Sequence, residues 1–289
     1  MSFDATSTAE EVTAGLDLRG ETILITGCNS GLGLESTRVL ASRGARIIGL
    51  ARTVEKARAA LDSVGAEGDA VACDLGDLAS VRAAVETVRG LAPLDVILAN
   101  AGIMALPTVQ QIAGVERQLF VNHVGHFVLV TGLLDRLTDA GRVVMLSSGA
   151  HHYAERGIEL DNAGGTTDYA PWRMYGRSKL ANILFARSLS RRFAGSDRVA
   201  ISLHPGVIQT NLGRHVPDAP AMYARLQHMM KTVPQGAATQ CLAAVHPMAA
   251  EWDGQYLSDC APKDTLPAGR DDALADALWA WSEDLVARL

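Results

Sequence analysis

Apolar runs typical of buried β-strands alternate with helical patterns from about residue 22 to the C-terminus, and this alternation limits the possible folds more than any other feature. Most runs are continuously apolar, which is typical of parallel strands buried on both faces. Strands are predicted at residues 22–26, 46–51, 69–73, 95–99, 142–147, 200–204 and 254–257. We therefore expect an α/β fold with a doubly wound parallel sheet of about seven strands.

Helical patterns fill the intervals between these strands. Helices are predicted at residues 33–43, 54–64, 78–91, 113–138, 175–193, 235–245 and 271–288. No repeat, low-complexity tract or linker divides the chain, so we expect one domain over 19–289, preceded by a polar extension at 1–18. Right-handed crossovers would place the helices on both faces of the sheet.

Composition narrows the functional classes. The chain has 289 residues, of which 48% are hydrophobic, enough for one well-buried domain. A net charge of −6 argues against nucleic-acid binding, which needs a basic face. No segment approaches the roughly 20 apolar residues of a membrane helix, and residues 1–18 do not resemble a secretory signal. With four cysteines in no paired spacing, we expect a cytoplasmic protein with reduced thiols and no membrane partner.

A glycine-rich turn follows the first predicted strand. After Thr26 come six residues that we assign to cofactor binding: Gly27, Asn29, Ser30, Gly31, Leu32 and Gly33. Such a turn can present free backbone N–H groups at a helix N-terminus to a pyrophosphate. An ordinary glycine-rich loop is the alternative, but the position in the first strand–helix unit favours a dinucleotide site.

The end of the second strand bears on which dinucleotide binds. Sites that prefer NAD usually carry an acidic residue there for the ribose 2′-hydroxyl, and this chain has Ala51 followed by Arg52. A guanidinium pairs well with a 2′-phosphate, so we expect NADP(H) rather than NAD(H). A solvated loop arginine is the alternative. Asp74 could accept a hydrogen bond from the adenine amine or cap the helix near Leu78.

Tyr175 and Lys179 lie four positions apart at the start of a predicted helix, on one helical face. There the ammonium could lower the pKa of the phenol toward a value useful for acid–base catalysis. A surface pair is the alternative. Ser148, at the end of the fifth strand, could donate a hydrogen bond to a substrate oxygen, with Ser147 as its competitor.

Together with Asn100-Ala101-Gly102 and Asn122, these motifs resemble the short-chain dehydrogenase/reductases, which have a single-domain Rossmann-type fold. The segments VNHVGHF at 121–127, LSSGAHH at 146–152 and HPGVIQT at 204–210 are similar to the retinol dehydrogenase-like branch, which includes WW-domain oxidoreductases. That branch is mostly linked to NADP(H).

The resemblance implies a role for each matching residue. Tyr175 would be the general acid or base, Lys179 would hold the nicotinamide ribose, Ser148 would bind the substrate oxygen, and Asn122 would anchor a water of the proton relay. The implied activity interconverts an alcohol with a ketone or aldehyde, without a metal. The further residues expected to contact the nucleotide are Leu75, Asn100, Ala101, Gly102, Pro205, Gly206, Ile208 and Thr210.

Two segments interrupt the alternation and are expected to cover the substrate. Twenty-seven positions separate Ser148 from Tyr175 because of an insertion at 151–172, and a second segment spans 211–234. In the second, apolar side chains at near-helical spacing could form a lid over a lipophilic or aromatic substrate. These side chains are Met222, Tyr223, Leu226, Met229 and Met230.

Two other functions compete with a small-molecule oxidoreductase. A non-catalytic NADP-binding sensor could use the same fold, although such proteins commonly lose the tyrosine. A sugar-nucleotide epimerase would have a longer chain and a differently spaced glycine turn. The resemblance also implies a homodimer or homotetramer, for which the apolar helices 113–138 and 175–193 would be suitable contacts.

Overall fold

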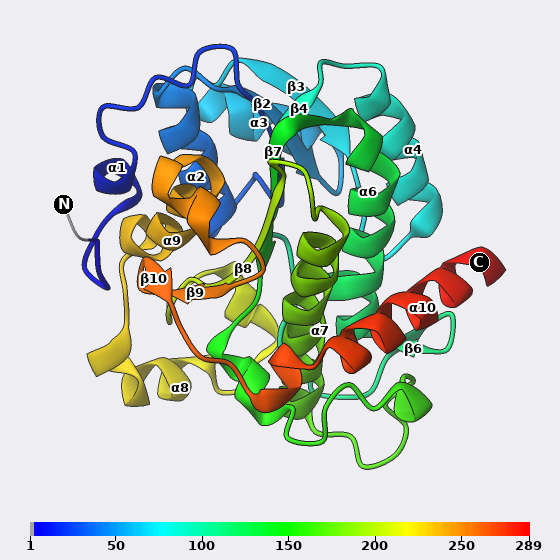
Figure 1. Cartoon of the computed structure of the whole chain (residues 1–289). Coiled ribbons are helices and arrows are strands. Elements are labelled where there is room, and N and C mark those ends of the chain that lie inside the picture. The colour runs from blue at the N-terminus through cyan, green and yellow to red at the C-terminus, as the bar shows by residue number, and fades with distance from the viewer. Residues whose placement is uncertain (1–2) are drawn as a thin grey trace.

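The computed structural model describes residues 3–289 and contains one central, mostly parallel sheet of eight strands (Figure 1). Its order is β10-β9-β8-β7-β4-β1-β2-β3. The strands are β1 (Thr22–Thr26), β2 (Arg46–Ala51), β3 (Gly68–Ala72), β4 (Leu94–Ala99), β7 (Leu137–Leu146), β8 (Val199–His204), β9 (Tyr256–Ser258) and β10 (Ala261–Pro262). Only β10 runs antiparallel, and it was not predicted. The doubly wound sheet is confirmed.

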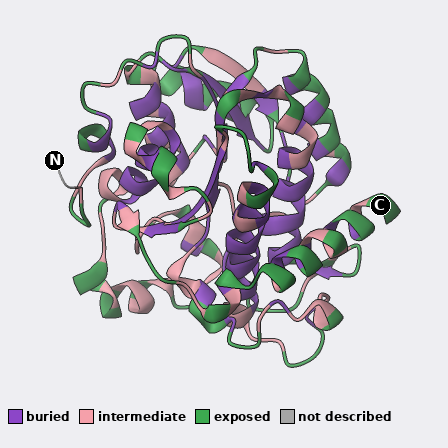
Figure 2. Cartoon of the chain, in the orientation of Figure 1, coloured by how far each residue is buried: buried purple, intermediate pink, exposed green. Residues whose placement is uncertain are grey.

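Helices cover both faces of this sheet. One layer contains α1 (Ala9–Val12), α2 (Gly31–Ser42), α3 (Val54–Ser63) and α9 (Val233–Val245). The other contains α4 (Leu78–Arg89), α6 (Gly125–Leu133), α7 (Pro171–Arg192) and α10 (Asp272–Arg288). Successive strand residues point to opposite layers, so Ile23 and Ile25 join the first core and Leu24 the second. The strands and the inner sides of the helices are accordingly buried (Figure 2).

The single helix expected at 113–138 is wrong. Its beginning is a hairpin of β5 (Gln111–Ile112) and β6 (Val115–Glu116), because Ala113 and Gly114 both adopt positive φ, at 49° and 80°. A short helix α5 (Arg117–Leu119), a π-helical turn (Phe120–Val124), α6 and a 3₁₀ turn (Leu134–Arg136) follow. Strand β7 then begins at Leu137, five residues before the predicted start.

Helix α7 begins four residues earlier than predicted. Pro171 occupies its first turn, where a missing backbone N–H costs nothing. Tyr175 is therefore in the second turn, and the buried Arg177 faces the preceding insertion. The Arg177 guanidinium donates to the backbone carbonyls of Asn162 and Ala163 at 2.7 and 3.2 Å, which fastens the insertion to α7.

The two irregular segments contain short helices. The first includes 3₁₀ turns at Gly149–Tyr153 and Leu160–Asn162. The second includes a 3₁₀ turn at Asn211–His215, helix α8 (Ala219–Arg225) and a 3₁₀ turn at Gln227–Met229. Two more 3₁₀ segments, Pro247–Trp252 and Pro267–Arg270, flank the β9–β10 hairpin.

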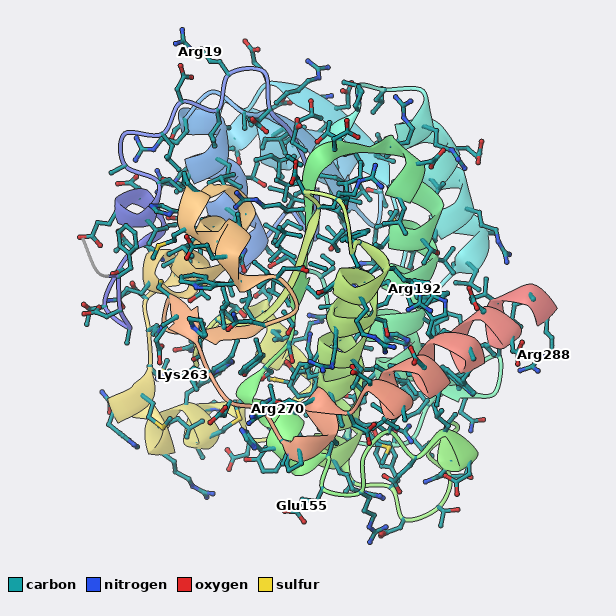
Figure 3. All side chains as sticks on the ribbon, in the orientation of Figure 1. Arg19, Glu155, Arg192, Lys263, Arg270 and Arg288 are labelled. Carbon is teal, nitrogen blue, oxygen red and sulfur yellow. The ribbon has the colours of Figure 1, made fainter. Side chains whose placement is uncertain are left out.

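Helix α10 packs across α7 and α6. The Trp279 ring lies 5.1 Å from Phe127 and 5.6 Å from Phe185, measured between ring centroids. The Arg192 guanidinium stacks over the same indole at 3.5 Å, between α7 and α10 (Figure 3). The apolar side of α6 and α7 that we considered for subunit contact is therefore covered in part by the chain's own C-terminal helix.

The segment before β1 packs on the domain rather than extending from it. A capping box formed by Thr8 and Glu11 starts α1, and Ala9 and Val12 are buried against the layer of α2 and α9. All four cysteines are free and buried. Among the described residues, the structure contains no helix with the length and hydropathy needed to cross a bilayer.

Candidate active site

A cleft of about 1600 Å³ opens at the carboxyl ends of the parallel strands. It brings together nearly all residues singled out from the sequence, which come from six strand ends and the segments after them. Those lining it are Gly27, Asn29, Ser30, Gly31, Leu32, Arg52, Asp74, Leu75, Asn100, Ala101, Gly102, Ser148, Tyr175, Lys179, Pro205, Gly206, Ile208 and Thr210. Gly33 and Asn122 lie behind the wall instead.

The glycine turn leaves space where a nucleotide would approach the backbone. Gly27 and Gly31 adopt positive φ values of 67° and 52°, which favour glycine. A Cβ on Gly33 would lie 2.2 Å from the Gly27 carbonyl oxygen and 2.6 Å from Nδ2 of Asn100. The turn thus closes tightly onto α2, whose first backbone N–H groups face the cleft, and this cradle fits a pyrophosphate.

Asn100 and Ala101 fasten the neighbouring strand end to this turn. Asn100 donates from Nδ2 to the Thr26 carbonyl at 2.8 Å, and the Ala101 N–H donates to Thr26 Oγ1 at 2.9 Å. Thr26 Oγ1 also lies 3.0 Å from Nε2 of His126, and Nδ1 of His126 lies 3.0 Å from the Asn122 carbonyl. The buried ring of His126, which was not predicted to belong to the site, therefore links the two loops.

The lining of the cleft is basic although the protein is acidic. Its cations without a carboxylate within 4 Å, in the described part of the chain, are Arg52, Lys56, Arg117, Lys179, Arg214 and Arg225. The two lining carboxylates are Asp74 and Asp218. Asp77, not Asp74, caps α4, and Asp74 accepts from the Gly76 N–H at 2.9 Å. A concentration of positive charge in a cleft attracts polyanionic ligands.

The two adjacent serines have different environments. Ser147 is buried and donates to the backbone carbonyl of Lys179 at 2.7 Å, so its hydroxyl holds β7 against α7. The Ser148 hydroxyl accepts from the Ala150 N–H at 3.1 Å and hydrogen-bonds with Tyr175. The geometry therefore pairs the second serine with the tyrosine.

Lys179 and Tyr175 face the cleft from one side of α7. The Lys179 ammonium lies 5.7 Å from the centre of the Tyr175 ring and donates to the Leu146 carbonyl at 2.9 Å. Burial lowers the pKa of Lys179 from 10.5 to about 8. Burial also raises the pKa of Tyr175 above its ordinary value, and the hydrogen bond with Ser148 offsets only part of that rise.

The sequence led us to expect a lowered pKa for Tyr175, whereas burial raises it above its ordinary value in this structure. Tyr175 is 3% exposed and packs with Met104 and Trp172, and this apolar environment disfavours the phenolate. The same environment disfavours the ammonium. The spacing in the sequence placed the pair on one helical face, but it could not indicate how completely the folded protein excludes water from that face.

Asn122 lies behind the wall of the cleft and supports this arrangement through hydrogen bonds. It lies in the π-helical turn, which displaces its side chain from the regular helical position. Its Oδ1 accepts from the Ile103 N–H at 2.8 Å, and its Nδ2 donates to the Ile103 carbonyl and to Ser178 Oγ, both at 2.9 Å. Since Ser178 donates to the Tyr175 carbonyl at 2.7 Å, Asn122 is connected to the backbone that carries the tyrosine.

The far half of the cleft is largely apolar. Side chains from three segments that are distant in sequence meet there: Met104, Leu106, Tyr153, Trp172, Leu212, Val216, Met222, Leu226 and Met229. The insertion at 151–172 contributes only its two ends to this lining, whereas the segment at 211–234 contributes along most of its length. His204, which was not predicted either, lines the cleft, and its buried Nδ1 has no hydrogen-bond partner among residues 3–289.

Four histidines predict that the fold is sensitive to acid: His123, His126 and His151 are buried, and His204 is half-buried. Burial lowers the pKa of His123 to about 3 and those of His126, His151 and His204 to about 4. Below pH 6.5 the unfolded chain binds protons that the folded protein excludes, so stability present above that pH is lost as the pH falls toward 4.

We expect the free energy of unfolding to fall by about 1.5 kcal/mol per such histidine between pH 6.5 and 5. Denaturant titrations at several pH values measure this slope, and His126→Gln should flatten it. A free energy of unfolding that stays constant over this range would contradict the assignment.

The fold and the site together define a Rossmann-type protein with a cleft that fits a dinucleotide beside a serine, a tyrosine and a lysine. A family model described as short chain dehydrogenase matches residues 21–221. The chain belongs to the short-chain dehydrogenase/reductase family, in the branch of retinol dehydrogenases and WW domain-containing oxidoreductases, and is an oxidoreductase of that family.

Individual relatives span nearly the whole chain. Short-chain dehydrogenase TIC 32 A, chloroplastic, of Brassica napus is 37% identical, covering 99% of this chain and 95% of its own. Retinol dehydrogenase 14 of Homo sapiens is 36% identical, covering 94% of this chain and 88% of its own.

Solved structures agree with the fold. An uncharacterized protein from Mycobacterium Paratuberculosis has a TM-score of 0.78 at 35% identity, covering 96% of this chain and 97% of that one. A blue fluorescent protein from a metagenomic library in complex with NADPH has a TM-score of 0.66 at 25% identity, covering 83% and 96%.

Proposed function

We propose that this protein is an NADP(H)-dependent oxidoreductase that interconverts an alcohol and a ketone or aldehyde on a lipophilic or aromatic substrate. The observation that carries the proposal is the cleft itself. Ser148, Tyr175 and Lys179 lie on one wall of it, and its lining also has cations without a carboxylate within 4 Å in the described part of the chain, together with apolar side chains around the tyrosine. The glycine cradle fits the pyrophosphate of a dinucleotide, and the apolar half fits a substrate with little charge.

When bound, the nicotinamide cofactor supplies or accepts the hydride. Tyr175 would give its proton to the substrate oxygen in reduction and take it back in oxidation. Its raised pKa keeps it protonated, as a general acid must be. Ser148 would donate a second hydrogen bond to the same oxygen, in a site from which apolar side chains exclude water. Lys179 would hold the ribose hydroxyls, and Asn122 would anchor the proton relay behind them.

The preference for NADP(H) is supported by Arg52, which stands at the end of β2 where an acidic residue would favour NAD(H). We expect Arg52→Ala to weaken NADPH binding by at least about 10-fold while NADH binding changes little, because only NADPH has a 2′-phosphate to lose this charge-assisted contact. Fluorescence titration with both cofactors measures the effect. An equal loss for both would mean that Arg52 does not contact the 2′-phosphate.

The relatives suggest lipophilic alcohols as the first substrates to test. The name retinol dehydrogenase implies retinol for that relative. In this chain, methionine, leucine and aromatic side chains line the apolar half of the cleft. They would accept an isoprenoid or an aromatic ketone. The name of the Brassica napus relative places that protein in the chloroplast. A cytoplasmic location and a homo-oligomer stay predictions for this chain, and light scattering on the purified protein tests the second.

The decisive experiment is a cofactor titration followed by a panel of lipophilic alcohols, ketones and aldehydes. Tight NADPH binding with turnover on any member is the expected result. Tight binding without turnover across a broad panel would favour a non-catalytic NADP sensor. The retained Tyr175 and Ser148 argue against that alternative.

A further inference from the structure

His126 is a fully buried histidine whose two ring nitrogens both have hydrogen-bond partners. Its Nδ1 lies 3.0 Å from the Asn122 carbonyl oxygen, and this nitrogen carries the proton because a carbonyl can only accept. Burial lowers the pKa of His126 to about 4, so the ring is neutral near pH 7 and its Nε2 is an acceptor. The Thr26 hydroxyl, 3.0 Å away, therefore donates to Nε2. The two neighbours thus specify one tautomer of the ring.

The hydrogen bonds of Thr26 extend this chain into a closed ring. Its Oγ1 accepts from the Ala101 N–H at 2.9 Å. Two residues further along, the Ile103 N–H donates to Oδ1 of Asn122 at 2.8 Å, and Asn122 is the residue whose carbonyl His126 holds. Two routes therefore join Thr26 to Asn122, one through the side chain of His126 and one through the backbone that follows Ala101. Because the ring is closed, neither route can shift without straining the other.

This ring lies between the nucleotide turn and the catalytic groups. Thr26 is the last residue of β1 and directly precedes the glycine turn. A Cβ on Gly102 would lie 3.1 Å from Oδ1 of Asn122 and 3.5 Å from Nζ of Lys179, so the ring also borders the lysine. From Asn122, hydrogen bonds through a serine hydroxyl reach the backbone carbonyl of Tyr175. The ring is therefore connected to the nucleotide turn at one end and to the backbone of the tyrosine at the other.

We propose that His126 is a positioning residue, whose neutral ring with the proton on Nδ1 holds the Asn122 turn, and with it Tyr175, in a fixed position relative to the nucleotide turn. The inference rests on the proposed NADP(H)-dependent oxidoreductase function. Hydride and proton must reach the same carbonyl group, so the cofactor and the tyrosine have to keep a fixed separation, and a displacement of about 1 Å can cost about 100-fold in rate. Because it is fully buried, His126 acts through its neighbours and not by contact with the substrate.

Two substitutions each preserve half of the hydrogen bonding of the ring. In His126→Asn the amide nitrogen takes the place of Nδ1 and can still donate to the Asn122 carbonyl. In His126→Gln the amide oxygen takes the place of Nε2 and can still accept from the Thr26 hydroxyl. Since either change opens the ring, we expect kcat to fall by about 10-fold in both variants and the Kd for NADPH to change by less than about threefold. Steady-state kinetics on a substrate from the panel and fluorescence titration measure the two quantities.

His123 provides the matched control, because it is a second buried histidine and lies about one helical turn before His126. Its Nε2 lies 2.8 Å from the Ser282 hydroxyl of α10, and its Nδ1 has no hydrogen-bond partner among residues 3–289. His123→Asn and His123→Gln should lower stability and leave kcat within about twofold. Equal losses of kcat in the His123 and His126 variants would overturn the inference, since the cause would then be the packing of this helix. An unchanged kcat in both His126 variants would overturn it as well.

Two further readouts do not require turnover. Nitrogen NMR of the imidazole distinguishes the tautomers, and the natural protein at pH 7 should show His126 with its proton on Nδ1; a proton on Nε2 would refute the proposed ring. In hydrogen exchange, NADPH should protect the amides of residues 119–124 in the natural protein and in the His123 variants, but less in the His126 variants. Equal protection in all of them would also refute it. If the natural protein binds NADPH but turns over no member of the panel, the proposed function fails, and the exchange result by itself decides the role of His126.

Discussion

Tyr175→Phe is expected to lower kcat by about 10³-fold or more, because it removes the phenolic hydroxyl that lies beside Ser148 and would exchange a proton with the substrate oxygen. The aromatic ring and its packing with Met104 and Trp172 are kept, so the fold and the nucleotide cradle should not change. Steady-state kinetics on any substrate found in the panel measures the loss. The Kd for NADPH, measured by titration, should stay within about twofold.

Substitutions of the two adjacent serines, Ser147 and Ser148, provide a comparison for the Tyr175 variant. Ser148→Ala should lower kcat by about 10²- to 10³-fold with the phenol intact, the typical cost of removing one donor to a developing oxyanion. Ser147→Ala removes the bond to the Lys179 carbonyl and should act mainly on stability. Full activity in the Tyr175 variant would refute the mechanism, and a larger kcat loss in the Ser147 variant would reassign the substrate-binding serine.

Gly33→Ala is expected to give the second large effect, on cofactor binding rather than on chemistry. The added methyl group would lie 2.2 Å from the Gly27 carbonyl oxygen and 2.6 Å from Asn100 Nδ2, so the turn must open. Opening the turn moves its backbone N–H groups away from the place where the pyrophosphate of the cofactor would bind. We expect the Kd for NADPH to rise by at least about 10²-fold and the free energy of unfolding to fall by about 1–3 kcal/mol.

A glycine at the end of α4 provides the control. A Cβ on Gly90 would meet only the Thr87 carbonyl oxygen, at an ordinary 3.4 Å, and Gly90 has a helical backbone. Gly90→Ala should therefore leave NADPH binding unchanged and stability unchanged or slightly higher. If Gly33→Ala binds NADPH as tightly as the natural protein does, the glycine turn is not the pyrophosphate site.

Several features of the site could be predicted because they depend on short stretches of sequence. The glycine turn, Ser148, and the pair Tyr175 and Lys179 each lie within a few residues of a strand end or on one helical turn. In a parallel sheet the carboxyl ends of the strands meet at one edge, so residues at those ends must converge. The strands β1 and β2 have the predicted bounds for a related reason, since a buried strand must be apolar on both faces.

Other features depend on contacts between distant segments and had no local signal. The hairpin at 111–116 depends on a positive φ at Ala113, a residue that sequence preferences assign to helices. His126 and His204 became part of the site only through neighbours about 100 and 55 positions away, as the Thr26 and Gly149 contacts show.

The sequence by itself determined the doubly wound sheet, the nucleotide cradle at its edge and the serine, tyrosine and lysine beside that cradle. It could do so because periodicity and motif spacing are local properties of the chain. Only the tertiary structure decided the pKa values of the site's tyrosine and lysine and which side chains line the cleft. Burial raises the pKa of Tyr175 and lowers that of Lys179, and burial is the sum of contacts from Met104, Trp172 and other segments that meet only when the chain is folded.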